Sequence, residues 1–426
     1  MEQQITKTPQ ETKPADVKKP NNKKKKKKEK KWVKFRHFVV RATLYWAIAP
    51  LAWIKYGVRV QKFKEQQKRP YLILMNHQTA FDQFFVGMAF RGPVYYLASE
   101  DLFSNGWVSS LIRYLVEPIP IKKQTTDIKA IINCIRVAMQ GGTIAIAPEG
   151  NRTFSGRTEY MSPSIAYLAK KLSLPIALYR IEGGYGVQPR WSDVTRRGKL
   201  RGYVSRVIYP EEFKEMSDAE LFAQIEKELY VNEAVADTTY THKKLAEYLE
   251  RAIYVCPKCG LSTFESHDDL FSCKKCGLTA RYTPTKEFAP VEGELPFRFV
   301  ADWYDYQSDY VNALDVTGMT DAPVYCEQAD LYEVIPYKKK VLLQKNVTLS
   351  LYGDRLLAKG ETAEYAFPYE TTMAVTLLGR NKLNVYADGK IYQLKSGKRF
   401  NALKYVHIFH RYKNIVKGEG STFLGL

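Results

Sequence analysis

Residues 71–82 read YLILMNHQTAFD, and this stretch joins an apolar run to a polar turn. The apolar run Tyr71–Met75 predicts a short buried strand. His77 lies just past its end, where α/β folds place their chemistry. Asp82 follows five residues later, so a helix that begins near Thr79 would bring its carboxylate against the imidazole. Such a pair fixes the tautomer of the histidine and leaves its other ring nitrogen as a general base.

The alternative for these two residues is an ordinary surface or core pair, because a histidine often lies near an aspartate without any chemical role. A second stretch favours chemistry. Thr143–Ala147 is another short apolar strand, and it ends in PEGNRT at residues 148–153. Gly150 would let the backbone approach a ligand closely, and Arg152 could hold a phosphate through two hydrogen bonds. Two strands thus each end in a polar loop, one with a base and one with a cation.

Together these two loops resemble sequence blocks of the glycerolipid acyltransferase family, whose best-known members are the 1-acyl-glycerol-3-phosphate acyltransferases. Residues 76–82, NHQTAFD, are similar to the NHxxxxD block of that family. Residues 148–153 are similar to its PEGTRS block, with Asn151 in place of threonine and Thr153 in place of serine.

Two further blocks follow the order and spacing of the family. Residues 119–123, IPIKK, resemble the block that ends in arginine, with Lys123 at the arginine position. Residues 174–178, LPIAL, resemble the block VPIVPV. The resemblance covers residues 34–232, which is roughly half of the chain.

The resemblance implies an acyltransferase that acts in phospholipid biosynthesis. A fatty acyl group would pass from an acyl thioester, on coenzyme A or acyl carrier protein, to the hydroxyl of 1-acyl-glycerol-3-phosphate (lysophosphatidic acid), giving phosphatidic acid. The acceptor hydroxyl would be the nucleophile, His77 its base and Asp82 the group that orients His77, while backbone N–H groups would stabilise the oxyanion. No metal is required for this chemistry. The implied substrate-binding residues are Asn76, Lys123, Glu149, Gly150, Arg152 and Thr153.

Among these residues, Arg152 and Lys123 would hold the acceptor phosphate and so orient the hydroxyl. The two departures from the family pattern, Asn151 and Lys123, leave the acceptor open. Another lysophospholipid or an amine-bearing lipid is the alternative.

The chain has 426 residues and a formal net charge of +20, which suits two or three domains and anionic partners. Much of the charge lies in residues 1–31, which end in KKPNNKKKKKKEKK and are expected to form a disordered polybasic tail. Three interpretations stay open for this tail: a solvated segment, an electrostatic tether to anionic membrane lipid, and a nucleic-acid-binding tail. No secretory signal peptide is recognisable, because no small-residue cleavage site follows an apolar core.

Residues 32–65 are expected to form a membrane-interfacial anchor. Their apolar stretch is rich in tryptophan and tyrosine but is interrupted by Arg41 and Pro50. A bilayer span needs about 20 apolar residues, so we expect a monotopic, kinked helix in the headgroup region, with a single span as the alternative. The protein would then act at the cytoplasmic face of the cell membrane.

Residues 66–235 are expected to form the acyltransferase domain, of the α/β class, with a mixed sheet flanked by helices. We expect Trp107 and Leu111 to lie in its core rather than against an acyl chain. The expected strands are residues 58–60, 71–75, 94–98, 118–123, 143–147 and 175–181. The expected helices are residues 84–90, 102–115, 127–140, 163–171 and 217–229.

Four of the six cysteines form two CxxC pairs, each followed by glycine, and thirteen residues separate the pairs. This spacing favours a metal site over disulfides in a basic chain without a secretory signal. Four thiolates form a closed tetrahedral site for a structural zinc ion, which resembles a zinc ribbon. We assign it to residues 236–290, with a preceding helix; a pair of redox dithiols is the alternative. The metal ligands would be Cys256, Cys259, Cys273 and Cys276.

Residues 291–426 have the pattern of a β-rich domain. A helix over 297–311 and a closing helix over 399–412 enclose eight short apparent strands, at residues 332–336, 340–344, 348–352, 355–358, 364–367, 373–378, 382–386 and 390–395. This order resembles a pleckstrin-homology-like barrel, which would bind lipid headgroups or a protein. Arg380 and three lysines, Lys382, Lys395 and Lys398, are expected on a solvated rim.

A competing function is that of a zinc-ribbon protein that binds nucleic acid or membranes. The aromatic-flanked apolar stretch suits a membrane better than a duplex, so nucleic acid is not the expected partner.

Overall fold

The computed structural model describes residues 30–67, 69–104, 106–121, 127–336, 338, 340–418 and 420–425. Residues 32–426 form one compact unit, which is the subject of the description that follows. The expected polybasic tail lies almost entirely outside the described residues, and so does Lys123. The roles suggested for them stay predictions.

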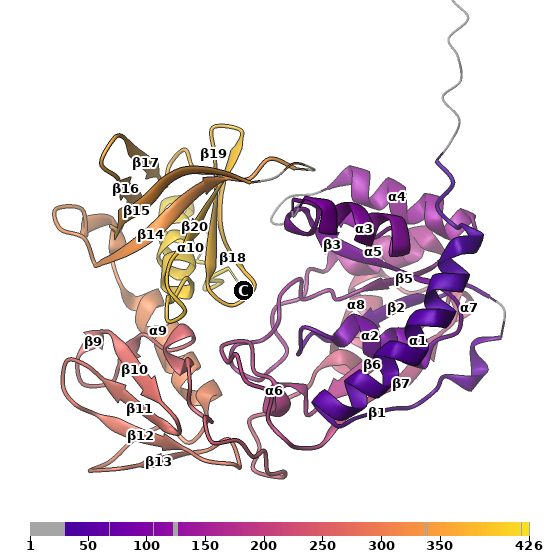
Figure 1. Ribbon diagram of the computed structural model, residues 1–426, viewed down its shortest axis with the longest axis horizontal. Coiled ribbons are helices and arrows are strands. Elements are labelled where there is room, and N and C mark those ends of the chain that lie inside the picture. Colours follow the sequence, from indigo (N-terminus) through magenta and orange to yellow (C-terminus); the bar gives the residue numbers. More distant parts are fainter. Residues whose placement is uncertain are drawn as a thin grey trace, which may run out of the picture. The chain divides into compact units, whose positions relative to one another are not determined.

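A seven-stranded mixed sheet forms the first half of this unit, in the order β1-β7-β6-β2-β5-β3-β4 (Figure 1). Strands β6, β2, β5, β3 and β4 run parallel, whereas β7 is antiparallel to β6. The strands are β1 (Val58–Val60), β2 (Leu72–Met75), β3 (Val94–Ser99), β4 (Ile119–Ile121), β5 (Thr143–Ile146), β6 (Ile176–Glu182) and β7 (Leu200–Ile208). The predicted mixed sheet is confirmed. The sequence reasoning missed β7, and β1 shows that the sheet begins before residue 66.

Helices cover both faces of this sheet. Leu72 and Leu74 of β2 pack into the core beneath α4, α5 and α8, while Ile73 and Met75 pack into the core beneath α1 and α2. Because β2 is buried on both faces, its apolar run is continuous rather than alternating. The helices are α1 (Phe35–Tyr56), α2 (Asp82–Ala89), α3 (Trp107–Val116), α4 (Ile128–Met139), α5 (Ser164–Leu172), α6 (Gly184–Val187), α7 (Pro210–Phe213) and α8 (Asp218–Leu229).

The helix expected over 102–115 is two elements, the 3₁₀ turn η2 (Glu100–Phe103) and α3. Gly106, with φ of 60°, precedes α3 in a left-handed conformation that an L-residue rarely adopts. The prediction that Trp107 and Leu111 are core residues is wrong, because their exposed fractions are 76% and 45%.

Helix α1 has the length and apolar composition needed to cross a membrane, and in the described part of the chain it is the one helix that does. Only 11% of its apolar window is buried, and Trp46, Trp53 and Ile54 are exposed. Pro50 lies inside this continuous helix. A single apolar helix near the N-terminus is weak evidence for membrane association, since soluble core helices and signal sequences have the same composition.

The second half of the unit is β-rich. A two-stranded and a four-stranded sheet carry the cysteines, and a seven-stranded antiparallel sheet follows in the order β17-β16-β15-β14-β20-β19-β18. The first two sheets comprise β8 (Val255–Cys256), β9 (Gly260–Leu261), β10 (Phe264–His267), β11 (Leu270–Cys273), β12 (Thr279–Tyr282) and β13 (Phe288–Pro290). The third comprises β14 (Tyr325–Glu333), β15 (Val341–Leu351), β16 (Arg355–Lys359), β17 (Glu364–Pro368), β18 (Ala374–Leu378), β19 (Lys382–Ala387) and β20 (Lys390–Lys395).

Two helices pack with these sheets, α9 (Val300–Ala313) and α10 (Leu403–Lys417). The expected β-rich domain with a closing helix is therefore present as a C-terminal half-barrel. The strands expected at 340–344 and 348–352 are a single strand, β15.

The expected boundary between residues 290 and 291 does not separate two hydrophobic cores. One hydrophobic cluster runs from Leu245 to Leu424 and also takes in Phe154, Tyr185 and Trp191 of the first half. The helix expected before the cysteines is absent: residues 236–248 are all described and contain no helix, and only the 3₁₀ turn η3 (Leu249–Arg251) precedes Cys256.

Candidate active site

His77 and Asp82 form a hydrogen-bonded pair at the carboxyl end of β2. Nδ1 of His77 lies 2.8 Å from Oδ2 of Asp82. Asp82 is fully buried at the first turn of α2, and it also accepts hydrogen bonds from the backbone N–H groups of Gln78 at 2.7 Å and Thr79 at 3.0 Å. The hydroxyl of Thr79 donates to its other oxygen at 2.6 Å. The carboxylate is thus held rigidly and can hold the imidazole in one orientation.

The second ring nitrogen of His77, Nε2, is left for another group. The side chain is a quarter exposed and lines a cavity. Burial lowers the pKa of His77, the bond to Asp82 opposes that shift, and the charges of Arg152 and Arg190 lower it further. The imidazole is therefore neutral at neutral pH, which is the state that a general base needs.

Glu149 joins the His77 loop to the loop that follows β5. Its carboxylate accepts hydrogen bonds from the backbone N–H of His77 at 2.7 Å and from that of Glu159 at 2.8 Å. The N–H of Thr153 donates back to the carbonyl of His77 at 3.4 Å. Burial raises the pKa of Glu149 well above its ordinary value, while these two backbone donors oppose the shift. Because β2 and β5 are parallel neighbours, the two loops meet at one edge of the sheet.

Two of the expected substrate-binding side chains are occupied by the protein itself. The amide of Asn76 is buried and exchanges two hydrogen bonds with the backbone of Ile181, at 2.7 and 2.8 Å. The hydroxyl of Thr153 is buried and accepts from the N–H of Gly156 at 2.9 Å. Both groups therefore shape the loops, and neither lines the cavity. Gly150 does line it, in a left-handed turn with φ of 64°.

Arg152 lies beside His77 and also lines the cavity. Burial and the charge of Arg380 lower the pKa of its guanidinium to about 10. Its Nη1 is buried, and no residue in the described ranges forms a hydrogen bond with it.

The sequence reasoning missed Arg190 altogether. It is 2% exposed, and its Nη1 donates to the carbonyl of Arg152 at 2.8 Å. Burial and the charge of Arg152 lower the pKa of Arg190 to about 9. No local pattern marks Arg190, because its partner lies 38 residues away in the chain.

The cavity beside His77 has a volume of about 1520 Å³. Its wall is mostly apolar, and the apolar side chains come from several helices. Examples are Leu44 and Ile48 of α1, Ile112 and Leu115 of α3, and Ile165 and Leu168 of α5. The site therefore combines a neutral base and a cation with a space suited to an apolar group.

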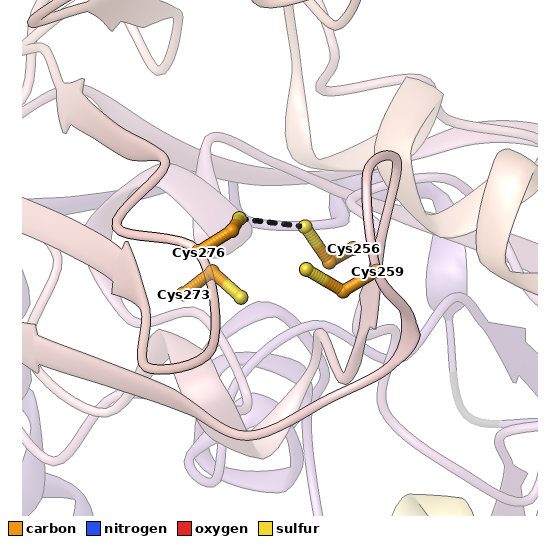
Figure 2. Close-up of side chains that lie close together, drawn as sticks. All are labelled: Cys256, Cys259, Cys273 and Cys276. Carbon is orange, nitrogen blue, oxygen red and sulfur yellow. Dashed lines mark hydrogen bonds between the residues drawn. The ribbon is translucent and has the colours of Figure 1, made fainter.

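The four cysteines of the CxxC pairs meet at a second site, and Figure 2 shows their sulfur atoms facing one another from two turns. All four sulfurs lie within 4.8 Å of one another, and those of Cys256 and Cys276 are 3.7 Å apart. That separation is too long for a disulfide of about 2.05 Å. It fits the edge of a tetrahedron with metal–sulfur bonds of about 2.3 Å. These cysteines could therefore hold a metal ion.

Known proteins resemble the first half of the chain. Residues 57–181 match the family model described as Acyltransferase. The chain is 21% identical over 183 residues to 1-acyl-sn-glycerol-3-phosphate acyltransferase BAT2, chloroplastic, from Brassica napus, a match that covers 41% of this chain and 51% of that protein. The chain thus spans about half the length of that curated relative.

A solved structure gives a further comparison. The crystal structure of the 1-acyl-sn-glycerophosphate (LPA) acyltransferase PlsC from Thermotoga maritima is 22% identical, with a TM-score of 0.39, and the match covers 45% of this chain and 77% of that one. The stretch that matches the Acyltransferase family model, residues 57–181, contains His77, Asp82 and Arg152.

Proposed function

We propose that this protein transfers a fatty acyl group from an acyl thioester to the free hydroxyl of 1-acyl-glycerol-3-phosphate. The observation that carries the proposal is the position of His77, bonded through Nδ1 to Asp82 and lining the large apolar cavity. The family match over residues 57–181 supports the reaction class. The relative from Brassica napus, named for this substrate, supports the acceptor.

The reaction needs one residue that acts first as a general base and then, once protonated, as a general acid. Nε2 of His77 takes the proton of the acceptor hydroxyl while its oxygen attacks the thioester carbonyl. The tetrahedral intermediate collapses, the carbon–sulfur bond breaks, and His77 returns the proton to the leaving thiolate. Asp82 holds the imidazole and stabilises the imidazolium between the two proton transfers. Backbone N–H groups would stabilise the oxyanion.

The acceptor would be held by its phosphate. Arg152 is the candidate, because its guanidinium lies beside His77, lines the cavity and has a buried N–H group without a partner. Lys123 is the second candidate from the sequence. A phosphate fixed at this point would orient the acceptor hydroxyl toward Nε2.

The acyl chain would lie in the cavity between the sheet and helices α1, α3 and α5. An apolar wall stabilises a bound hydrocarbon chain through the hydrophobic effect, and it contributes little binding free energy for a polar acyl group. The donor carrier, coenzyme A or acyl carrier protein, stays open, and so does the length of the chain.

The cysteine cluster would bind one zinc ion with a structural role. The fit of the sulfur separations to a tetrahedron supports this assignment. Four thiolates would close the site and leave no position for a substrate, so the ion would stabilise the fold around it.

The remaining assignments concern the membrane. The exposed aromatic side chains of α1 and the polybasic tail support a peripheral or monotopic position on anionic lipid, at the cytoplasmic face. The strand order of the C-terminal half-barrel, with a helix after its last strand, supports the pleckstrin-homology-like assignment.

The test is an acceptor panel. Purified protein would be given a labelled acyl-CoA with lysophosphatidic acid, lysophosphatidylcholine, lysophosphatidylethanolamine or monoacylglycerol, and the labelled lipid would be separated and counted. We expect phosphatidic acid to form fastest. Faster transfer to another acceptor would reassign the substrate. If no acceptor is acylated, the assay would be repeated with labelled acyl carrier protein as the donor. No transfer from either donor, together with salt-sensitive DNA or RNA binding, would favour the binding-protein alternative.

A further inference from the structure

Two arginines from distant parts of the chain, Arg190 and Arg380, lie close to Arg152, which lies beside His77. Arg152 follows β5, Arg190 follows α6, and Arg380 is at the tip of the hairpin between β18 and β19. Nε of Arg190 donates to the carbonyl of Gly379 at 2.9 Å and its Nη1 to that of Arg152 at 2.8 Å. Arg190 therefore ties the C-terminal hairpin to the loop that carries the PEGNRT block.

The hairpin tip belongs to the same cavity as His77. Gly379 lines that cavity together with His77 and Arg152. The tip is held from behind, because the amide of Asn381 donates to the carbonyls of Gly397 at 3.1 Å and Lys398 at 3.3 Å. The C-terminal half thus contributes Gly379 to the wall, and Arg380 is the next residue of the same hairpin tip.

Negative charge around these arginines falls short of the positive charge. Asp193 is 3.2 Å from Nη1 of Arg380, but it is shared with buried Arg251, which binds it through two nitrogens at 2.8 and 3.2 Å. Within the described residues, the hydrogen bonds of Arg190 go to neutral oxygens, while Glu159 acts on Arg190 and Asp82 acts on Arg152 through their charges alone. Among the described residues, no carboxylate forms an ion pair with either Arg152 or Arg190. Buried charge of one sign requires an opposite charge.

Unused hydrogen-bond donors point the same way. Nη1 of Arg152 and Nε of Arg380 are both buried and have no hydrogen-bond partner among the described residues. Buried N–H groups are normally bonded, so each such group needs an explanation. The two groups belong to arginines whose charges already act on each other, since the charge of Arg380 lowers the pKa of Arg152. An anion between them would satisfy both donors.

We propose that Arg152, Arg190 and Arg380 form one phosphate site, in which Arg380 of the C-terminal half sets the specificity of the reaction for a phosphate-bearing substrate. The inference rests on the proposed acyl transfer for its identity as a substrate site. Arg190 and Arg380 both lie outside residues 57–181, the stretch matched by the acyltransferase family. The ligand is a phosphate monoester, which either the acceptor or the 3′-phosphate of coenzyme A could supply.

The kinetic test compares Arg380→Gln, Arg380→Lys and Lys359→Ala with the wild type. Lys359 is the matched control, because it is an exposed cation of the same half-barrel on β16, near the opposite edge of the sheet from β18. We expect Arg380→Gln to raise the KM of one substrate by at least about tenfold, with little change in kcat, because charge-assisted hydrogen bonds are lost. Arg380→Lys should recover part of the loss, and Lys359→Ala should match the wild type.

The substrate whose KM rises identifies the source of the phosphate. A rise for lysophosphatidic acid, without a rise for monoacylglycerol, assigns the site to the acceptor. A rise for acyl-CoA, without a rise for acyl carrier protein, assigns it to the donor. Unchanged KM values in folded Arg380→Gln, or an equal loss with phosphate-free substrates, would overturn the proposal.

Anion binding can be tested without turnover. In the His77→Ala background, sn-glycerol 3-phosphate and inorganic phosphate should raise the thermal midpoint, and Arg380→Gln should remove this shift. If the wild type shows no acyl transfer, anion binding that depends on Arg380 would leave the phosphate site standing and reject the proposed function. Acyl transfer without such dependence in either assay would reject the phosphate site alone.

Discussion

The His77 loop and the cysteine cluster hold reactive side chains in opposite ways. In the His77 loop, backbone N–H groups donate hydrogen bonds to Asp82, and Asp82 in turn is hydrogen-bonded to Nδ1 of His77. The imidazole lines the cavity, and its Nε2 can act on a substrate. In the cysteine cluster, four sulfur atoms face one another. This difference indicates different roles. A side chain that reacts must be able to contact a substrate, whereas a side chain that stabilises the fold finds its partners within the protein.

After the loss of His77 itself, the largest effect is expected at Asp82. Asp82→Asn keeps the shape of the side chain but removes the charge that stabilises the imidazolium and fixes its tautomer. We expect kcat to fall by roughly 10²- to 10⁴-fold with little change in the KM of either substrate. Steady-state kinetics measure it, with Asp309→Asn as a carboxylate control. A kcat within a few-fold of the wild type would show that Asp82 does not act in catalysis.

Metal removal is expected to act on stability instead. A zinc chelator, or Cys273→Ser, should remove one zinc per chain and lower the thermal midpoint by several degrees, because metal binding at such a site contributes directly to folding. Metal analysis measures the loss of zinc, and thermal melting measures the loss of stability. We expect kcat to be unchanged at temperatures where the chain stays folded. Cys326→Ser, at a cysteine outside the cluster, is the control. Reversible disulfides without bound metal would favour the redox alternative.

Glu149 should show a mixed effect. Glu149→Ala leaves two partly buried N–H groups, those of His77 and Glu159, without this acceptor. We expect a loss of about 1–3 kcal/mol in the free energy of unfolding, together with lower kcat because the His77 loop loosens. Denaturant unfolding and kinetics on the same sample measure the two. Unchanged stability would mean that Glu149 does not join the loops.

The smallest effect is a shift in pH dependence. The pKa of His77 is lowered, so its neutral, active form persists below the ordinary histidine pKa of about 6.5, and activity should fall only at lower pH. Arg152→Gln removes a neighbouring positive charge and should move this acid limb to higher pH. The kcat/KM profile measures the shift. A shift to lower pH would contradict the assigned electrostatics.

The sequence predicted local features well. The spacing of His77 and Asp82, the strand ends that carry them, and the CxxC pairs all depend on residues close together in the chain. The meeting of the two polar loops could also be foreseen, since neighbouring parallel strands end at one edge.

Long-range contacts could not be predicted. Arg380 was expected on a solvated rim, yet it is ion-paired with Asp193, 187 residues away. Asn76 was expected to bind substrate, but its amide is bonded to Ile181, 105 residues away. Neither partner leaves a periodic or local signal, so only the fold reveals them.

The most direct test of the catalytic claim compares His77→Ala with His267→Ala. His267 is an exposed histidine beside the cysteine cluster, bonded to Glu265, and its loss removes an imidazole without touching the cavity. Release of a labelled acyl group from its thioester to lysophosphatidic acid would be measured for both variants and the wild type. We expect His77→Ala to lose acyl transfer and His267→Ala to retain it. Normal transfer by a folded His77→Ala protein would contradict the account.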